Sequence, residues 1–250
     1  MEYKYYAKSD PIETIKEHTD KLLENLEILK KEYGKKITQS IEMPEKRFWQ
    51  LMKIVCKYHD AGKVFLGFQN AIREAIGEEL IPTKFNNQEI KHEQISPMFV
   101  PYKQYEMTKK ERKLVYQVIY YHHERDNKIH INSELLEEII KEDIEPNIKK
   151  IEKELQIEIP KLSTFYLGMV EGQARITEGD ELYNEYCLMK GLLHRLDHCS
   201  SAWITVEDET KEEIVDFVEE FMKKQNFKEN DLQQFAEKNQ DKNVIVIGST

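Results

Sequence analysis

The sequence predicts an all-α protein, a bundle of helices, with one short strand near the C-terminus. Apolar residues recur at helical spacing through most of the chain, and capping residues precede several of these segments. No stretch before residue 243 alternates convincingly between apolar and polar residues over five or more positions, as a half-buried strand would.

The first helix is expected to begin at Asp10–Pro11. An acid in the capping position followed by proline in the first turn is typical of a helix start, and Glu13 lies three residues after the cap. The residues that would then share one face of this helix are Ile15, His18, Leu22, Leu26 and Leu29.

A second helix is expected from near Pro44 to about Gly62, and a third over about 64–76 that stops at Gly77. One face of the second helix is expected to carry apolar residues and to end on a histidine. The residues of this stripe are Phe48, Met52, Val55 and His59. Residues 77–91 are expected to form a loop, because the helical pattern stops there.

Thr108 and Glu111 form a capping box, which predicts another helix start. Val115, Ile119 and His122 align on that helix. The remaining helices are expected over about 133–142, 147–156, 181–201 and 211–224. The long helix over 181–201 carries Leu182, Tyr186, Met189, Leu193 and Asp197 in register.

The C-terminal residues change character. Residues 243–250 contain four consecutive β-branched residues followed by Gly248, which favours a buried parallel strand that leads into a loop. A phosphate-binding loop of the form G-x-x-x-x-G-K-[ST] starts in this way, and the chain stops at its third position. A terminal edge strand is the alternative. We expect one helical domain over 1–222, and a linker and the beginning of a second domain over 223–250.

The charge balance limits how the chain can bind nucleic acid. There are 37 basic and 47 acidic residues, which gives a formal net charge of −10. A protein that holds DNA or RNA by a broad basic surface is therefore not expected. A nucleic-acid substrate would have to be held locally, with help from bound metal or from a partner.

Cysteine usage and hydropathy indicate the cellular compartment. The three cysteines, Cys56, Cys187 and Cys199, show no CxxC spacing, so neither a disulfide framework nor a zinc–cysteine site is expected. No apolar run approaches the length of a membrane span, and the N-terminus lacks the apolar stretch of a secretory signal. We therefore expect a cytoplasmic protein.

Several histidines and aspartates lie at helix ends or at helical positions where an apolar residue would be expected. They are His18, His59, Asp60, His92, His122, His123 and Asp197. Helices that direct imidazoles and carboxylates into a shared interior build metal sites in bundles. His59 and Asp60 differ by about 100° around a helix, so both reach one site only near its C-terminal end, where Gly62 places them.

This set of side chains suits phosphodiester hydrolysis. Two metal ions about 3.5–4 Å apart can activate water at neutral pH and offset charge on the phosphate. Imidazole and carboxylate ligands without thiolate favour manganese, iron, cobalt, nickel or zinc. Each residue alone has a simpler explanation, since a histidine on an apolar stripe is often a core residue, and Asp197 can pair with Arg195 or Lys190. The joint occurrence of the set favours one or two divalent ions.

The series resembles the HD nuclease domain of the CRISPR-associated nuclease–helicase of type I interference systems, over roughly residues 10–205. The matching stretches are Glu17-His18, Tyr58-His59-Asp60-Ala61-Gly62-Lys63, Phe68-Gln69, His92-Glu93, Tyr121-His122-His123 and Leu196-Asp197-His198-Cys199-Ser200-Ser201-Ala202. In that family a superfamily-2 helicase commonly follows the nuclease domain. Leu232-Gln233-Gln234 and residues 243–250 look like the beginning of such a RecA-like helicase domain.

The resemblance implies a role for each matching residue. It implies that the seven histidines and aspartates named above are metal ligands, with Asp60 bridging two ions. It also implies that Asp60 and Lys63 are catalytic, and that Lys63 contacts the scissile phosphate or supports the site, although a plain helix C-terminal charge is the alternative. Ser201, or its neighbour Ser200, would orient substrate or ligands. The implied substrate is single-stranded DNA, and the implied partners are a helicase domain in cis and the CRISPR surveillance complex.

Two other functions remain open from the sequence. The same scaffold serves small-molecule phosphohydrolases that act on nucleotides, although the His122-His123 pair and the truncated phosphate-binding pattern disfavour this. Alternatively, the domain is a helical docking module without catalytic activity. Tyr120 and Tyr121 are candidates for stacking on bases, with core packing as the alternative.

Overall fold

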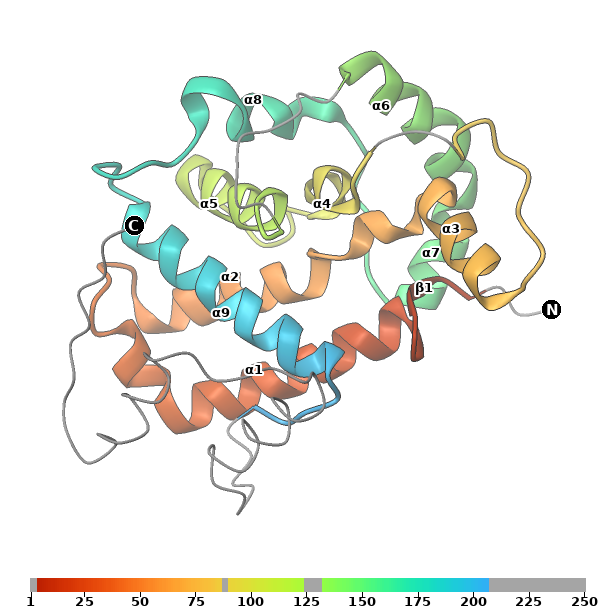
Figure 1. Cartoon of the computed structure of the whole chain (residues 1–250). Helices are drawn as coiled ribbons and strands as arrows, with labels where there is room; N and C mark the ends of the chain where they lie inside the picture. The colour runs from red at the N-terminus through yellow and green to blue at the C-terminus, as the bar shows by residue number, and fades with distance from the viewer. Residues whose placement is uncertain (1–3, 87–89, 124–131, 207–250) are drawn as a thin grey trace, which may run out of the picture. The chain divides into compact units, whose positions relative to one another are not determined.

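The computed structural model describes residues 4–86, 90–123 and 132–206, all of which belong to one compact unit. The helical class predicted from the sequence is confirmed in these residues (Figure 1). No helix among them is long and apolar enough to cross a membrane. The helix expected over 211–224, the strand over 243–250 and the domain division at 222 lie outside the described residues.

The α-helices agree with the periodic segments of the sequence, except that the second helix ends at Tyr58 and not near Gly62, where a separate 3-10 turn lies instead. They are α1 (Ile15–Thr38), α2 (Glu45–Tyr58), α3 (Leu66–Ile76), α4 (His92–Ile95), α5 (Lys109–Tyr120), α6 (Ser133–Ile139), α7 (Ile148–Leu155), α8 (Leu167–Val170) and α9 (Tyr183–Ser201). Short 3-10 or π turns join several of them, among them Ala61–Val64 and Ser96–Phe99. The short helices α4 and α8 are not predicted by periodicity, because neither contains two full turns.

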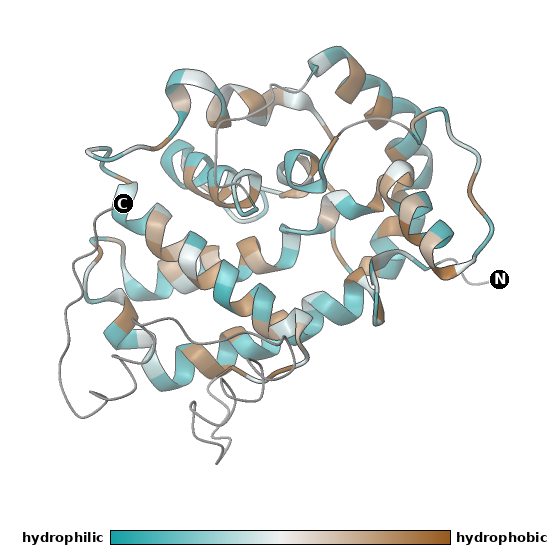
Figure 2. Ribbon diagram, in the orientation of Figure 1, coloured by the Kyte–Doolittle hydropathy of each residue, from teal (hydrophilic) through white to brown (hydrophobic). Residues whose placement is uncertain are grey.

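Four helices enclose the centre of the molecule. α1 packs against α2 and α9, and α5 packs against the same two helices (Figure 1). In Figure 2 each of these helices carries apolar and polar residues side by side, as amphipathic helices do. The stripes predicted from the sequence supply the core, including Leu22, Met52, Val55, Val115 and Leu193, which are all fully buried.

The N-terminal segment differs from the sequence prediction. Two short antiparallel strands, β1 (Tyr6–Ser9) and β2 (Ile12–Thr14), form a hairpin, and α1 begins only at Ile15. The prediction that a helix starts at Asp10–Pro11 is therefore wrong. The two strands, of four and three residues, are shorter than the five-residue alternation that the sequence analysis required of a strand.

The physical reason is that two capping signals lie close together in the sequence. Thr14 caps α1, since its side chain accepts a hydrogen bond from the Glu17 N–H in a capping box. Asp and Pro also favour turns, so Asp10–Pro11 closes the hairpin instead of starting the helix. The hairpin directs Glu13, a buried residue, towards the interior.

Asp143 fixes the start of α3 from a distant part of the chain. Its Oδ2 atom accepts a hydrogen bond from the Leu66 N–H at 2.9 Å, one of the N–H groups that a helix cannot satisfy itself. Burial raises the pKa of Asp143 to about 6, although this hydrogen bond lowers it. The folded-state pKa lies above the ordinary value of 3.8, so the folded chain holds this proton where the unfolded chain has released it.

We therefore expect Asp143→Asn to stabilise the protein in a pH-dependent way. The contribution of Asp143 to the free energy of unfolding is complete below about pH 4. It is lost as the pH rises to about 6, because the folded chain must then bury a charged carboxylate. The amide keeps an oxygen for Leu66 and carries no charge. Thermal unfolding with chelator present should show a gain of about 1–3 kcal/mol at pH 8 and almost none at pH 4. An equal gain at both values would contradict the explanation.

Candidate metal centre

The end of α2 brings His59 and Asp60 to one site. The helix stops at Tyr58, His59 is its C-cap, and Asp60 lies in a non-helical conformation before the 3-10 turn at Ala61–Val64. Because the backbone leaves the helix between them, the two side chains reach the same interior space. The sequence analysis predicted this arrangement from the position of Gly62.

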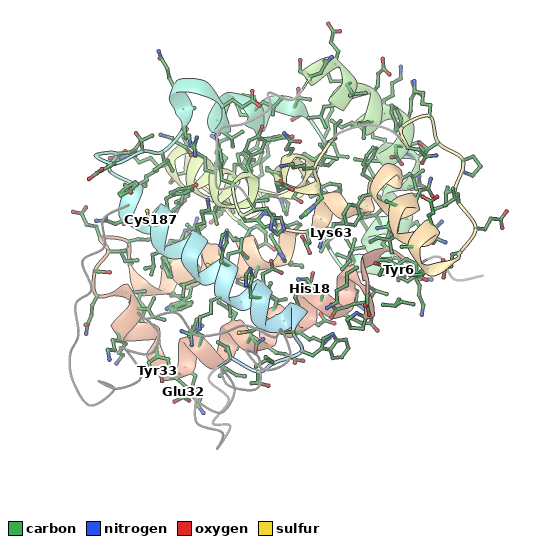
Figure 3. All side chains as sticks on the ribbon, in the orientation of Figure 1. Tyr6, His18, Glu32, Tyr33, Lys63 and Cys187 are labelled. Carbon is green, nitrogen blue, oxygen red and sulfur yellow. The ribbon has the colours of Figure 1, made fainter. Side chains whose placement is uncertain are left out.

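Other elements supply the remaining side chains. His18 comes from α1, His92 is the first residue of α4, and Asp197 comes from α9. His122 and His123 follow the last turn of α5. His18 and Lys63 both contact Asp60, and Figure 3 shows the two labelled side chains near each other.

Asp60 is the centre of the cluster. Its Oδ1 atom lies 3.1 Å from His92 Nε2, and its Oδ2 atom lies 3.5 Å from His59 Nε2 and 3.7 Å from His18 Nε2. Asp197 Oδ1 lies 3.0 Å from His18 Nε2 and 3.9 Å from His59 Nε2. His18, His59 and Asp60 are buried, so these groups face one another away from bulk water.

The cluster divides into two groups that share Asp60. One contains Asp60, His92, His122 and His123, and the other contains His18, His59 and Asp60. Within each group the potential ligand atoms lie within 4.8 Å of one another. Asp197 contacts the second group through His18 and His59. The structure thus brings together all seven residues that the sequence singled out as candidate ligands.

Hydrogen bonds outside the cluster orient the histidine rings. Nδ1 of His59 lies 2.9 Å from the carbonyl oxygen of Cys56 and can donate to it, and Nδ1 of His122 lies 2.6 Å from that of Ile119. These bonds leave Nε2 of both rings directed at the cluster with its lone pair free. Metal-binding histidines are oriented in this way in many proteins.

The inward atoms show that the cluster fits a cation. His59 Nε2 and His122 Nε2 are buried and have no hydrogen-bond partner among the described residues. Buried polar atoms without partners are costly to a fold. Imidazole nitrogen and carboxylate oxygen are the donors that divalent transition ions accept. The cluster therefore indicates divalent metal binding.

The protonation states of most of these groups suit ligation. Burial lowers the pKa of His59 and holds that of His122 well below its usual value, so both are neutral. Burial raises the pKa of Asp60, but the neighbouring His59, Lys63 and His92 lower it far more, and the carboxylate stays ionised.

His18 differs from the other histidines. Burial lowers its pKa, but hydrogen bonds with Asp197 and Glu13 raise the pKa by more than burial lowers it, to about 9. Without metal its ring therefore carries a proton near neutral pH. A cation bound at the second group would have to displace this proton.

Lys63 lies beside Asp60. Its ammonium is 2.8 Å from Asp60 Oδ2, and its side chain is mostly buried. The sequence analysis expected Lys63 to contact a phosphate, and the structure places its charge at the cluster. The alternative of a solvated helix-end charge does not match this position.

The two serines differ in exposure. Ser201 is exposed at the last residue of α9, one turn beyond Asp197, and its carbonyl oxygen accepts a hydrogen bond from Lys8. Ser200 is buried, and its hydroxyl accepts a hydrogen bond from Asn25 at 3.3 Å. Ser200 therefore supports packing between α1 and α9, and only Ser201 lies where a substrate has access.

Sequence reasoning missed several residues of the site. Glu13 Oε2 lies 3.5 Å from His18 Nδ1, and Glu93 Oε2 lies 3.5 Å from His92 Nδ1. His194, one turn before Asp197 on α9, contacts the carbonyl oxygen of His122. His194 could have been predicted from the sequence, because it lies one helical turn before Asp197 and therefore on the same face of the helix. No local signal marks Glu13, because its approach to His18 depends on the hairpin.

Glu13 is also held by two lysines. Lys21 Nζ lies 2.6 Å from its Oε1 atom and Lys8 Nζ 2.9 Å from its Oε2 atom. Burial raises the pKa of Glu13, but bonds from His18, Lys21 and Lys8 outweigh this and bring it to about 2. An ionised carboxylate is thus fixed behind His18.

We expect Glu13→Gln to weaken metal binding by about tenfold to a hundredfold, the usual effect of losing an outer partner of a ligand. Calorimetric titration of the metal-free chain with Mn²⁺ measures this. Glu17→Gln is the matched control, because glutamine preserves the capping box and, among the described residues, the Glu17 side chain forms hydrogen bonds only with Thr14. Equal affinities for the two variants would rule out this role for Glu13.

The comparison with family models agrees with the geometry of the site. Residues 21–248 match a family model described as "Cas3, HD domain". A search of curated proteins finds no match. Among solved structures, the CRISPR-associated Cas3 HD domain protein from Methanocaldococcus jannaschii aligns with a TM-score of 0.47 and 21% sequence identity, covering 78% of this chain and 98% of that one.

Proposed function

Because the chain belongs to the Cas3 HD-domain family, we propose that it is a metal-dependent nuclease that hydrolyses phosphodiester bonds of single-stranded DNA in type I CRISPR interference. The family itself implies a CRISPR-associated HD nuclease domain. The observation that carries the proposal is the convergence of seven histidine and aspartate side chains, with the unpartnered Nε2 atoms of His59 and His122 directed inwards.

In this proposal the seven side chains hold one or two divalent ions of manganese, nickel, cobalt, iron or zinc. Asp60 belongs to both groups, so its two oxygens can contact both sites. Divalent ions bound there would lower the pKa of water and offset the negative charge on a phosphate.

Two further residues would hold the substrate. Lys63 is tied to Asp60 in this structure, and engagement of Asp60 by a cation would release its ammonium for a phosphate oxygen. Ser201 would offer a hydroxyl at the exposed end of α9, on the face that carries Asp197.

The net charge of −10 limits the affinity of the chain alone. Lys110 and Lys113, two candidate surface cations, are already paired with Glu181 and Asp180. We therefore propose that a surveillance complex and a helicase domain in cis deliver the strand. Residues 1–222 would form the nuclease domain and 223–250 the linker and beginning of the helicase. The free cysteines Cys56, Cys187 and Cys199 are consistent with a cytoplasmic location.

The test uses the full chain, stripped of metal by a chelator and then supplied with Mn²⁺, Co²⁺ or Ni²⁺. The substrates are an end-labelled single strand, the same strand as a duplex, and a panel of nucleotides. We expect metal-dependent shortening of the single strand. Phosphate release from nucleotides with an intact strand would replace the proposal by a nucleotide phosphohydrolase. No bound metal and an unchanged melting temperature on metal addition would favour a docking module.

A further inference from the structure

The two tryptophans of the chain have opposite environments. Trp49 is 3% exposed and belongs to the core, whereas Trp203 is 56% exposed just after the end of α9. A large exposed aromatic ring gains little from folding, because about half of its surface stays in water. Packing alone therefore does not account for tryptophan at this position.

The backbone of Trp203 is also in an unusual conformation. Its φ angle is +60°, in the left-handed region that glycine prefers at helix ends. Two hydrogen bonds hold it there, from Trp203 N–H to the Ser200 carbonyl at 3.2 Å and from Ile204 N–H to that of Cys199 at 2.9 Å. Residues held in such conformations are concentrated at functional sites. The helix end fixes the indole in place at some cost in backbone strain.

A chain of contacts joins this indole to the metal centre. The Lys21 ammonium lies over the Trp203 ring and is 2.6 Å from Glu13 Oε1. Glu13 in turn contacts His18. Lys8 binds the same carboxylate and donates to the carbonyl of Ser201 at 2.7 Å, so the hairpin is tied to the end of α9. The ring is thus linked to His18 of the cluster through Lys21 and Glu13.

The surroundings of the ring suit a strand of nucleic acid. The side chains of Lys8 and Lys21 are partly exposed, at 22% and 23%, and share the single carboxylate of Glu13. The two lysines therefore leave a net positive charge at the Lys21 side of the ring in an otherwise acidic protein. Aromatic rings bordered by cations bind single strands, because every base has a face that can stack and every nucleotide a phosphate. Tyr120 and Tyr121, the stacking candidates from the sequence, are buried in the core instead.

We propose that Trp203, backed by Lys21, stacks against an unpaired base of the DNA strand and holds that strand at the metal centre. This inference deepens the proposed nuclease function and rests on it. Bases in a duplex are already stacked on each other, so Trp203 would also favour single-stranded over double-stranded substrate.

Binding is tested with the full chain in chelator, so that no strand is cut. We expect an oligothymidylate to quench tryptophan fluorescence, and an abasic strand of the same length and charge to quench it far less. Anisotropy of a labelled strand should show about fivefold to a hundredfold weaker binding for Trp203→Ala. Trp203→Phe should restore most of the affinity. Ile204→Ala, which removes a neighbouring side chain that is 50% exposed, is the control and should bind like the unaltered chain.

Two results would overturn the stacking role. One is binding by Trp203→Ala within twofold of the unaltered chain, and the other is equal quenching by the abasic strand. A different result would contradict the nuclease proposal alone. In that result no metal supports cleavage of the strand, although binding of the strand still depends on Trp203. With active metal, Trp203→Ala should raise KM and leave kcat nearly unchanged, since the ring does not touch the reacting atoms.

Discussion

Replacement of Asp60 by asparagine is expected to reduce metal-dependent strand cleavage by about a thousandfold or more. Asp60 is the residue shared by the two potential ligand groups, with its oxygens 3.1 Å from His92 Nε2 and 3.5 Å from His59 Nε2. Asparagine keeps the shape of the side chain but has one neutral oxygen. The loss of several kcal/mol of charge stabilisation in the transition state corresponds to this factor.

Two measurements check this expectation. Cleavage of a labelled single strand gives the rate, and elemental analysis after dialysis gives the bound metal, which should fall for both groups together. Asp143→Asn is the matched control, since Asp143 is also a buried aspartate but contacts the Leu66 N–H instead of the cluster. Retention of more than a tenth of the activity by Asp60→Asn would show that the shared position of Asp60 is not needed for the reaction.

The convergence of four of the seven candidate ligands was predictable from sequence because it follows from helical periodicity. His18, His59, His122 and Asp197 lie on the same stripes as buried apolar residues, so any packing of those stripes brings them into one interior. Helices packed through such stripes leave few alternatives for where these side chains meet. This is why the meeting of these four side chains was predictable although no contact between helices was known, whereas His92 and His123 were expected at the site only from the family resemblance.

Residues placed by long-range contacts could not be predicted in the same way. Glu13 reaches His18 only because β1 and β2 form a hairpin, and the local signals at Asp10–Pro11 favoured a helix start as well as a turn. Trp203 gains its position from the helix end and from Lys21, which is 182 residues away in sequence. Periodicity contains no information about either contact.

Gly62 shows how closely the segments around the metal centre approach one another. A Cβ atom at this position would lie 2.2 Å from the carbonyl oxygen of His92, 2.8 Å from Ser96 N and 2.9 Å from Ser96 Oγ. The Ser96 hydroxyl also bridges the two segments, because it accepts from the Gly62 N–H and donates to the His92 carbonyl, both at 2.9 Å. The segment after Asp60 is therefore packed directly on the backbone of α4.

We expect Gly62→Ala to destabilise the fold by about 3 kcal/mol and to weaken metal binding as well. The atoms that a methyl group would meet are mainly backbone, so they cannot move aside cheaply, and overpacking of this kind typically costs about 1–3 kcal/mol. A shift of α4 would also move His92 away from Asp60. Thermal unfolding with and without Mn²⁺ should show a melting temperature lower by about 6–12 °C and a smaller gain from the metal.

Gly191→Ala provides the control for this substitution. Gly191 lies within α9, and a Cβ atom there would meet nothing within 4 Å, so the variant should be as stable as the unaltered chain or more stable by up to about 1 kcal/mol. A Gly62→Ala variant that melts like Gly191→Ala and binds metal normally would mean that α4 can move away from residue 62. In that case the position of His92 would not depend on this contact, and the close approach would have no part in assembling the metal centre.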